Sequence, residues 1–207
     1  MGELNLEQLS GIYMDVLKEI GNIGAGNAAT ALAQMLQCKV DMKVPQVRLL
    51  DFKDVGTLMG GEEQIMIGID LTIEGDITGS IMFMMSTDTG KHLCNKLMFM
   101  QSDTKEQEFS EMECSALQEV GNIITGSYLN SLASMTNLVM YPSVPSLCID
   151  MAGAILSVPA IEFGALADNI LLIQTQFFDE EELNGYFILV PDLESYPKIL
   201  TSLGIQI

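Results

Sequence analysis

The chain has 207 residues, 48% of them hydrophobic, which is enough to bury a core. Its 28 acidic and 9 basic residues give a formal net charge of −19, which repels the phosphates of nucleic acids and of an anionic membrane surface. No apolar run reaches the roughly 18 residues that a membrane span needs, and the N-terminus lacks the basic and apolar regions of a secretory signal. Composition therefore excludes nucleic acid as a partner, argues against membrane insertion and predicts a cytoplasmic protein.

Cysteine and histidine usage signals neither a metal site nor a disulfide framework. Cys38, Cys94, Cys114 and Cys148 show no C-x-x-C spacing, and His92 is the single histidine. We expect all four cysteines to be buried or half-buried hydrophobic residues.

Hydrophobic spacing and turn residues predict a regular series of elements in the first half of the chain. The expected elements are one helix or two abutting helices over 5–36, a strand over 39–49, a short helix or turn over 51–59, a hairpin of strands 64–73 and 77–85, and a helix through about residue 99. Pro45 argues that the first strand lies at a sheet edge or contains a break. Ser86, Thr87 and Asp88 are candidate caps of the last helix.

The second half repeats this order after a polar linker over 101–108. The expected elements are a helix over about 110–136, strands over about 170–178 and 185–190, and a last helix over 193–203 that Asp192 caps. Between them, Pro142-Ser143-Val144 matches Pro45-Gln46-Val47, and 147–151 takes the place of 48–52.

The repeated order predicts an α+β fold built by tandem duplication of helix, strand, short helix, hairpin and helix. A single domain, 1–207, is expected to contain two repeats, at about 5–100 and 109–207. Hairpins favour antiparallel pairing, so two half-sheets of about three strands can merge into one mainly antiparallel sheet. We expect the two long helices, related by a pseudo-twofold axis, to cover this sheet.

The two long helices carry the same polar motif one hundred residues apart. The pattern Asp15-x-x-x-Glu19-x-x-Asn22 recurs as Ser115-x-x-x-Glu119-x-x-Asn122. Nine positions between 16 and 36 are identical to the position one hundred residues later: Leu17, Glu19, Gly21, Asn22, Ile23, Gly26, Leu32, Ala33 and Met35. Glutamate and asparagine are poor choices for a core, so two copies of the pair indicate two copies of a site.

Helical geometry places the motif on the outer face of the first helix. Asp15, Glu19 and Asn22 fall within an arc of about 60°, because successive residues are about 100° apart. The apolar side chains expected on the opposite face are Val16, Leu17, Ile20 and Ile23. The small residues expected to continue the polar stripe as a flat surface are Gly26, Ala29 and Ala33. Such a surface can admit a loop or backbone of another molecule.

The glycines of this helix need a reason. Gly21, Gly24 and Gly26 each cost roughly 1 kcal/mol relative to alanine in a helix. Close packing between helices and close approach of a partner are both possible reasons, and the sequence leaves them open.

The motif residues fit the positioning of a water better than covalent catalysis. A carboxylate can pair with a lysine, and an amide can donate to and accept from a water. The sequence shows no triad of serine or cysteine with histidine. Two glycine patterns are also rejected as nucleotide sites: 24–29 lies inside a helix instead of following a strand, and 121–127 lacks the lysine of a P-loop.

At these residues the chain resembles the CheC family of chemotaxis phosphatases, which is related to CheX and to the phosphatase-like part of FliY. The resemblance covers essentially the whole chain. Its most specific elements are the two Asp/Ser-x-x-x-Glu-x-x-Asn motifs and the segments 19–27 and 149–151. It implies hydrolysis of the aspartyl phosphate on the response regulator CheY.

The resemblance also implies the role of each motif residue. The implied catalytic residues are Glu19, Asn22, Glu119 and Asn122. The asparagines would orient a water for in-line attack, and the glutamates would pair with the active-site lysine of the regulator. Asp15 and Ser115 take a supporting role. The resemblance implies that the regulator supplies the Mg²⁺ ion, so we expect this chain to need no metal or cofactor of its own. Phosphoryl transfer depends mainly on positioning and electrostatics.

The second copy departs from the first just beyond the motif. Ile124 and Thr125 replace Gly24 and Ala25, and the bulky Tyr128 and Leu129 replace Ala28 and Ala29. We therefore expect both sites to be competent but to differ in access or rate.

CheC proteins also bind CheD, the receptor deamidase, through a short helix in the second half. By position this helix begins near Asp150 and includes Ala152, Gly153 and Ala154. Asp150 is a candidate contact for CheD or an ordinary helix N-cap, as Asp51 can be. A chain with two sites needs no dimer to supply them, so we expect a monomer or a heterodimer with CheD.

Three other functional hypotheses compete with the phosphatase hypothesis. The chain can be a non-catalytic adaptor or flagellar-switch-like module that docks phosphorylated CheY, or its main role can be the regulation of CheD. The switch version normally carries a further C-terminal domain, for which a chain ending at Ile207 has no room. A purely structural repeat is the weakest reading, because it gives no reason for Glu and Asn on an outward stripe twice.

Overall fold

The structure is a computed structural model that describes residues 11–99, 108–162, 169–178, 182–192 and 194–204. The elements of the first half are α1 (Gly11–Leu36), β1 (Asp41–Asp51), α2 (Phe52–Leu58), β2 (Ile65–Gly75), β3 (Gly79–Ser86) and α3 (Thr87–Leu97). The elements of the second half are α4 (Glu111–Thr136), β4 (Met140–Pro142), β5 (Ser146–Met151), α5 (Ala152–Glu162), β6 (Asn169–Phe178), β7 (Glu182–Pro191) and α6 (Ser195–Ser202). This order confirms the predicted α+β fold with a duplicated series of elements.

The strands form one antiparallel sheet through which the two halves interleave. The strand order is β1-β6-β7-β3-β2-β4, and β5 also pairs with β2. β1 of the first half therefore pairs with β6 of the second half, and β5 of the second half pairs with β2 of the first. The sequence predicted a merged sheet, but not this exchange of the first strand between halves.

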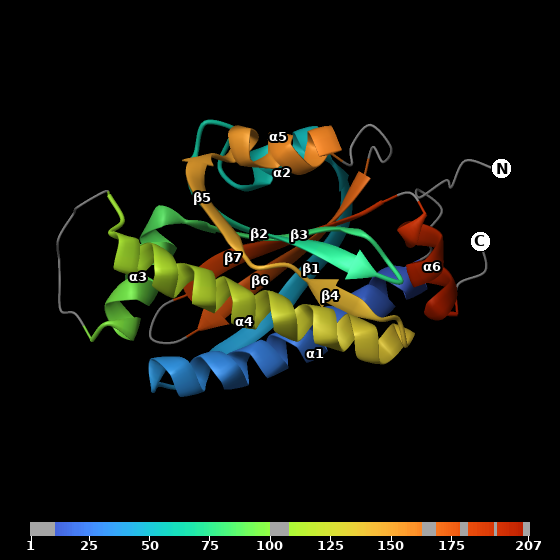
Figure 1. The fold of residues 1–207 in the computed structure, drawn as a ribbon, viewed down its shortest axis with the longest axis horizontal. Coiled ribbons are helices and arrows are strands. Elements are labelled where there is room, and N and C mark those ends of the chain that lie inside the picture. Colours follow the sequence, from blue (N-terminus) through green and yellow to red (C-terminus); the bar gives the residue numbers. More distant parts are fainter. Residues whose placement is uncertain (1–10, 100–107, 163–168, 179–181, 193, 205–207) are drawn as a thin grey trace.

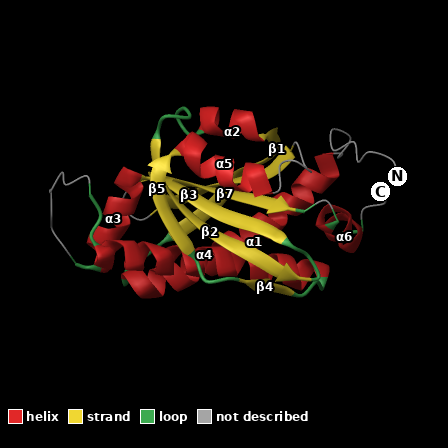
Figure 2. Ribbon diagram, turned by 45° about the horizontal axis from the view of Figure 1, so that its top comes forward, coloured by secondary structure: helices red, strands yellow, loops and turns green. Residues whose placement is uncertain are grey.

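Helices cover both faces of the sheet (Figures 1 and 2). Ile81, Phe83 and Met85 of β3 join the core beneath α1 and α4, whereas Met82 and Met84 join a second core beneath α2 and α5. Strands covered on both faces read as continuous apolar runs, as β3 does. The prediction that the long helices cover the sheet is confirmed, but α2 and α5 cover the face that it left open.

α1 and α4 run in opposite directions and pack closely against each other (Figure 1). A Cβ on Gly24 of α1 would lie 3.1 Å from Cγ of Tyr128 on α4. The Tyr128 ring also lies 4.1 Å from that of Phe187, and its hydroxyl is 3.1 Å from the hydroxyl of Thr175. Tyr128 and Leu129 are both buried. These bulky residues of the second copy therefore serve packing, and they do not restrict access to its motif.

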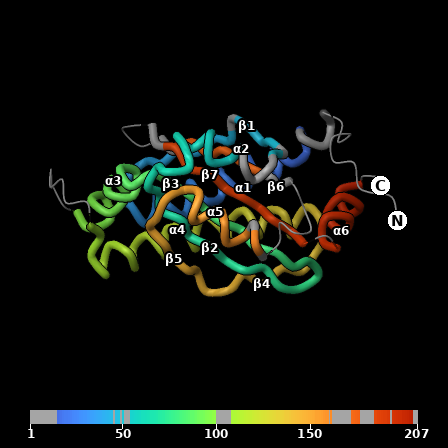
Figure 3. The backbone as a smooth tube through the Cα atoms, turned by 90° about the horizontal axis from the view of Figure 1, so that it is seen from above, coloured from blue at the N-terminus to red at the C-terminus, as the bar shows by residue number. Residues whose placement is uncertain are grey.

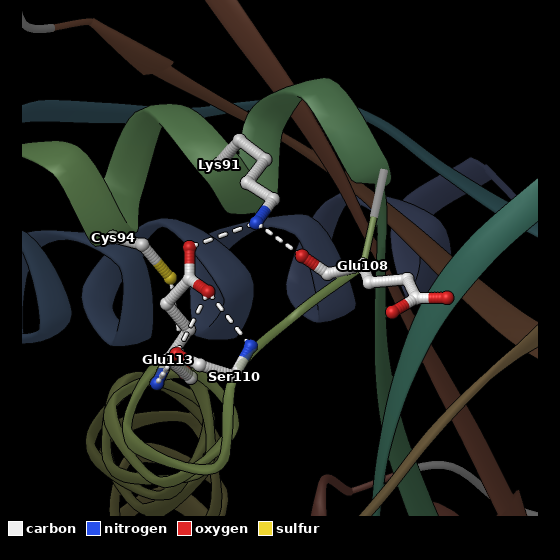
Figure 4. Close-up of polar contacts among 5 residues, drawn as sticks. All are labelled: Lys91, Cys94, Glu108, Ser110 and Glu113. Atoms are coloured by element: carbon white, nitrogen blue, oxygen red, sulfur yellow. Dashed lines mark hydrogen bonds and ion pairs between the residues drawn. The ribbon is translucent and has the colours of Figure 1, made fainter. Parts of the chain in front are cut away.

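A polar cluster between α3 and α4 fixes the start of α4 (Figure 4). Ser110 and Glu113 form a capping box, in which the Ser110 N–H donates to Glu113 Oε2 at 2.8 Å. Lys91 Nζ lies 2.8 Å from Glu113 Oε1 and 2.7 Å from the Glu108 carbonyl oxygen. Burial raises the pKa of Glu113, but the bonds from Lys91 and Ser110 outweigh it and hold the pKa below its ordinary value. The helix that carries the second motif is thus anchored at its first turn.

The structure contains the predicted break in the first strand and two of the predicted helix-capping contacts. β1 lies at the sheet edge with a register irregularity around Pro45, as that proline predicted. The Ser86 hydroxyl accepts the Thr89 N–H at 3.1 Å and caps α3. Asp192 accepts the Ser195 N–H at 2.8 Å at the start of the last helix. The expected helix over 5–10 and most of the linker over 101–108 lie outside the described residues.

Candidate functional site

The first motif lies on the exposed face of α1. Asp15, Glu19 and Asn22 are all exposed, whereas Leu17 and Ile20 are buried beneath the helix. Glu19 and Asn22 are three residues apart and therefore neighbours on the helix surface. The carboxylate and the amide project together, as the sequence predicted.

The first motif also borders the edge strand of the sheet. The Val44 N–H of β1 donates to Asn22 Oδ1 at 3.4 Å, and Val44 itself is 3% exposed. The methyl groups of Val44 lie 3.4 Å from the point where Gly21 would carry a Cβ. The side-chain oxygen of Asn22 is therefore already hydrogen-bonded to the backbone of β1.

The second motif lies on α4 in the same way. Ser115, Glu119 and Asn122 are exposed. The Ser115 hydroxyl donates to the Glu111 carbonyl oxygen within the helix at 2.9 Å. Gln118, next to Glu119 and one turn before Asn122, donates through Nε2 to the Pro145 carbonyl oxygen at 3.2 Å. The loop between β4 and β5 thus lies beside the second motif.

The two motifs are not brought together. Asn22 contacts β1 at one edge of the sheet, whereas Gln118 contacts the loop that joins β4 to β5 at the other edge. Seen from above, β1 and the β4–β5 segment lie at opposite margins of the molecule (Figure 3). The arrangement therefore places the two motifs on separate parts of the surface.

The glycines of the motif helices divide into two groups. A Cβ on Gly121 would lie 2.6 Å from two atoms of Ile69, so this glycine allows α4 to approach the sheet. Gly24 similarly allows the contact with Tyr128. By contrast, a Cβ on Gly26 or Gly126 would meet nothing within 4 Å. Packing therefore explains Gly24 and Gly121. It does not explain Gly26 and Gly126, each of which lies one turn beyond a motif asparagine.

Two predictions about this helix face are wrong. Ile23 was expected in the core, but it is 39% exposed, because it lies only about 40° around the helix from the exposed Glu19. Ala29 was expected on the flat outer stripe, but it is 9% exposed and belongs to the core. The exposed stripe continues from Gly26 to Thr30 instead.

Strand register corrects the alignment of the two halves. Asp51 pairs with Asn169 at the start of β6, and Met151 pairs with Ile65 at the start of β2. Met151, not Asp150, is therefore the counterpart of Asp51, and each directly precedes its short helix. The same spacing of one hundred residues aligns 44–45 with 144–145, both Val-Pro, so the expected match of 142–144 to 45–47 is three residues out.

The residues expected to contact CheD lie at the end of β5 and the start of α5. Asp150 is exposed on β5, and its carboxylate accepts the Met151 N–H at 2.7 Å. The helix begins at Ala152, which is buried and cannot contact a partner directly. Gly153 and Ala154 are half-buried.

The four cysteines differ in exposure. All four cysteines are free thiols; Cys94 is buried and Cys38 and Cys114 are half-buried, but Cys148 is exposed, contrary to expectation. Burial raises the pKa of the Cys94 thiol to about 12. His92 is half-buried on α3. Among the described residues, no three His, Cys, Asp or Glu side chains gather closely enough to hold a metal ion.

Within the described part of the chain, no helix combines the length and apolar character that crossing a membrane requires.

Two motif-bearing helices over an interleaved sheet define a duplicated α+β protein with paired surface sites, and sequence comparison gives its family. The sequence model of the CheC-like family matches residues 12–48 and 112–149, which contain both motifs. The chain is 38% identical over 195 residues to the CheY-P phosphatase CheC of Bacillus subtilis (strain 168), covering 92% of this chain and 93% of that protein. This chain belongs to the CheC-like family.

Solved structures share the fold. The chain matches the crystal structure of Thermotoga maritima FliY with a TM-score of 0.77 at 20% identity, covering 95% of this chain and 98% of that one. It also matches a chain of the CheX–CheY–BeF3–Mg²⁺ complex from Borrelia burgdorferi with a TM-score of 0.51 at 19% identity, covering 82% of this chain and 96% of that one. The chain therefore shares its overall fold with these proteins.

Proposed function

We propose that this chain is a phosphatase that hydrolyses the aspartyl phosphate of a CheY-type response regulator at both motifs. The observation that carries the proposal is the exposed Glu–Asn pair, one helical turn apart, on each of two helices. The Bacillus subtilis relative, which is named a CheY-P phosphatase, supports the same activity. Because its substrate would be a chemotaxis regulator, we place the chain in the cytoplasm.

The proposed reaction is hydrolysis of an acyl phosphate. The oxygen of a water attacks phosphorus, the bond between phosphorus and the carboxylate oxygen breaks, and the products are inorganic phosphate and free aspartate. Asn22 or Asn122 would orient the water through its amide, since an amide can both donate to and accept from it. Positioning of this kind supplies much of the catalysis in phosphoryl transfer.

The glutamates would fix the position of the docked regulator. The carboxylate of Glu19 or Glu119 would pair with the lysine of the regulator's active site, so that the neighbouring asparagine faces the phosphoryl group. Asp15 and Ser115 lie one turn before the glutamates and would support the docked regulator. The Mg²⁺ ion would be held by the regulator, so this chain would supply no metal ligand.

We further propose that Asp150 contributes to binding of CheD. Its exposure at the junction of β5 and α5 supports this role. The chain would then act as a monomer or as a heterodimer with CheD. Asp150→Ala should weaken binding of purified CheD about tenfold in titration calorimetry without slowing phosphate hydrolysis. The matched control is Asp41→Ala, because Asp41 is an exposed acid on β1, at the other edge of the sheet.

The experiment that tests the phosphatase proposal is the decay of phosphate from purified, phosphorylated CheY in the presence of Mg²⁺. The proposal predicts that catalytic amounts of the wild-type chain accelerate this decay. Unchanged decay together with tight binding of a BeF3-loaded regulator would instead indicate the non-catalytic adaptor. Adding CheD to both assays shows whether its regulation is the main role.

A further inference from the structure

Each motif has a valine near it, and the two valines differ in exposure. Val44 and Val144 occupy equivalent positions, because each precedes the proline of the repeated Val-Pro pair. Val44 is 3% exposed and lies beneath Gly21, whereas Val144 is 87% exposed. An aliphatic side chain left this exposed gains no burial energy in the folded chain, whereas a partner that covers it would gain roughly 25 cal/mol per Å² of apolar surface.

Val144 is held in this exposed position by its neighbours on both sides. The Ser143 N–H donates to the Thr72 carbonyl oxygen at 2.8 Å, and the Thr72 N–H donates to the Ser143 hydroxyl at 3.0 Å. On the other side, Gln118 of α4 donates to the Pro145 carbonyl oxygen at 3.2 Å. The loop is therefore fastened both to β2 and to the helix that carries the second motif.

The loop also lies next to the residues that would meet the regulator. Gln118 directly precedes Glu119, and it is four residues before Asn122, so these side chains are neighbours on the helix surface. Its contact with Pro145 places Val144 at the border of the second motif. The first motif has no such valine, because Val44 is buried and its N–H is bonded to Asn22.

We propose that Val144 is a substrate-binding residue of the second site alone, where it packs against the phosphorylated regulator whose acyl phosphate faces Asn122. This inference rests on the proposed function and assigns the two sites different docking contacts. Val144 takes no part in the chemistry, so it affects the concentration of regulator that the second site needs and leaves the rate of the bound complex unchanged.

The test uses chains with one active site each. In the Asn22→Ala chain, which retains the second site, Val144→Ser should raise KM for the phosphorylated regulator roughly tenfold, the effect of exposing one buried valine, with kcat within about twofold. Val144→Ile in the same chain should leave the KM unchanged, because it keeps an aliphatic side chain at this position. The matched control is Val158→Ser, since Val158 is 51% exposed on α5, away from both motifs.

The comparison with the first site decides whether the contact is local. Val144→Ser in the Asn122→Ala chain should change KM by less than about twofold, since that chain retains only the first site. An unchanged KM at the second site, an equal rise at both sites, or an equal rise for Val158→Ser would overturn the proposal.

A binding measurement separates this inference from the proposed activity. If no variant hydrolyses phosphate, the phosphatase proposal fails, but titration with a BeF3-loaded regulator still measures docking. The chain used for this titration carries Glu19→Lys, which would repel the regulator's lysine and remove binding at the first site. Val144→Ser should then weaken the affinity of the second site by the same factor. Equal affinities with and without the substitution would overturn the contact independently of catalysis.

Discussion

At the scale of single residues, we expect alanine substitutions at Gly121 and Gly126 of α4 to have opposite effects on stability. Gly126→Ala should stabilise the protein by about 0.5–1 kcal/mol, because its Cβ meets nothing within 4 Å and alanine favours the helix. Gly121→Ala should destabilise it by about 1–3 kcal/mol, because its Cβ would lie 2.6 Å from buried Ile69. Urea denaturation measures both, and equal signs would contradict the division of the glycines.

Residue-scale prediction from the sequence succeeded where helical geometry alone decides the outcome. Glu19, Asn22 and their counterparts are exposed as predicted, because their spacing fixes a common face. It failed for Ile23 and Cys148, because hydrophobic character does not reveal which neighbours cover a side chain. Val144 was missed for the same reason, although the repeated Val-Pro pair offered a signal.

At the scale of elements, Glu113 joins α3 to the start of α4. Glu113→Gln should lower the free energy of unfolding by about 1 kcal/mol at neutral pH, because the charged bonds to Lys91 and Ser110 weaken. The pKa of Glu113 is lower in the folded state, so the unfolded chain binds more protons as the pH falls. The contribution is therefore complete above the ordinary glutamate pKa of about 4.3 and is lost below it.

Chemical denaturation of wild type and variant at several pH values checks this dependence. The free energies of unfolding of the wild type and of Glu113→Gln should converge as the pH falls below about 4. Glu111→Gln is the control, because Glu111 is exposed in the same first turn and its loss should change stability by less than about 0.5 kcal/mol. A difference for Glu113→Gln that persists unchanged into acid would refute the assigned role.

Element order could be predicted from the sequence, but register could not. Helices and strands follow from local periodicity, so α1 and α4 were found with the correct ends at 36 and 136. The offset between Asp51 and Asp150 was one residue out, because apolar strands offer several similar alignments. Only the pairing of Met151 with Ile65 fixes it.

At the scale of the whole molecule, the interleaved sheet predicts that neither half folds alone. β1 pairs with β6 and β5 pairs with β2, so each half lacks the partner of its own first strand. Chains of 1–100 or 108–207 should therefore show no cooperative urea transition separately, and a 1:1 mixture should regain one. Cooperative unfolding of an isolated half would contradict the prediction of a single domain. The sequence could not predict the interleaving, because alternation does not tell which half supplies a strand's partner.

The placement of the motifs at opposite edges of the sheet would give the proposed phosphatase two independent sites. Each site would have its own asparagine, so the loss of one should leave the other working. Asn22→Ala and Asn122→Ala should each abolish the contribution of one site, by on the order of 100-fold at that site.

The measurement that tests the central claim most directly is the rate of phosphate loss from CheY with the Asn22→Ala/Asn122→Ala double variant. The variant must unfold at the wild-type urea concentration and bind the BeF3-loaded regulator, which shows that fold and docking are intact. The account predicts that its stimulation of phosphate loss disappears while each single variant keeps part of it. A double variant that still accelerates the loss as the wild type does would contradict water positioning by these two asparagines.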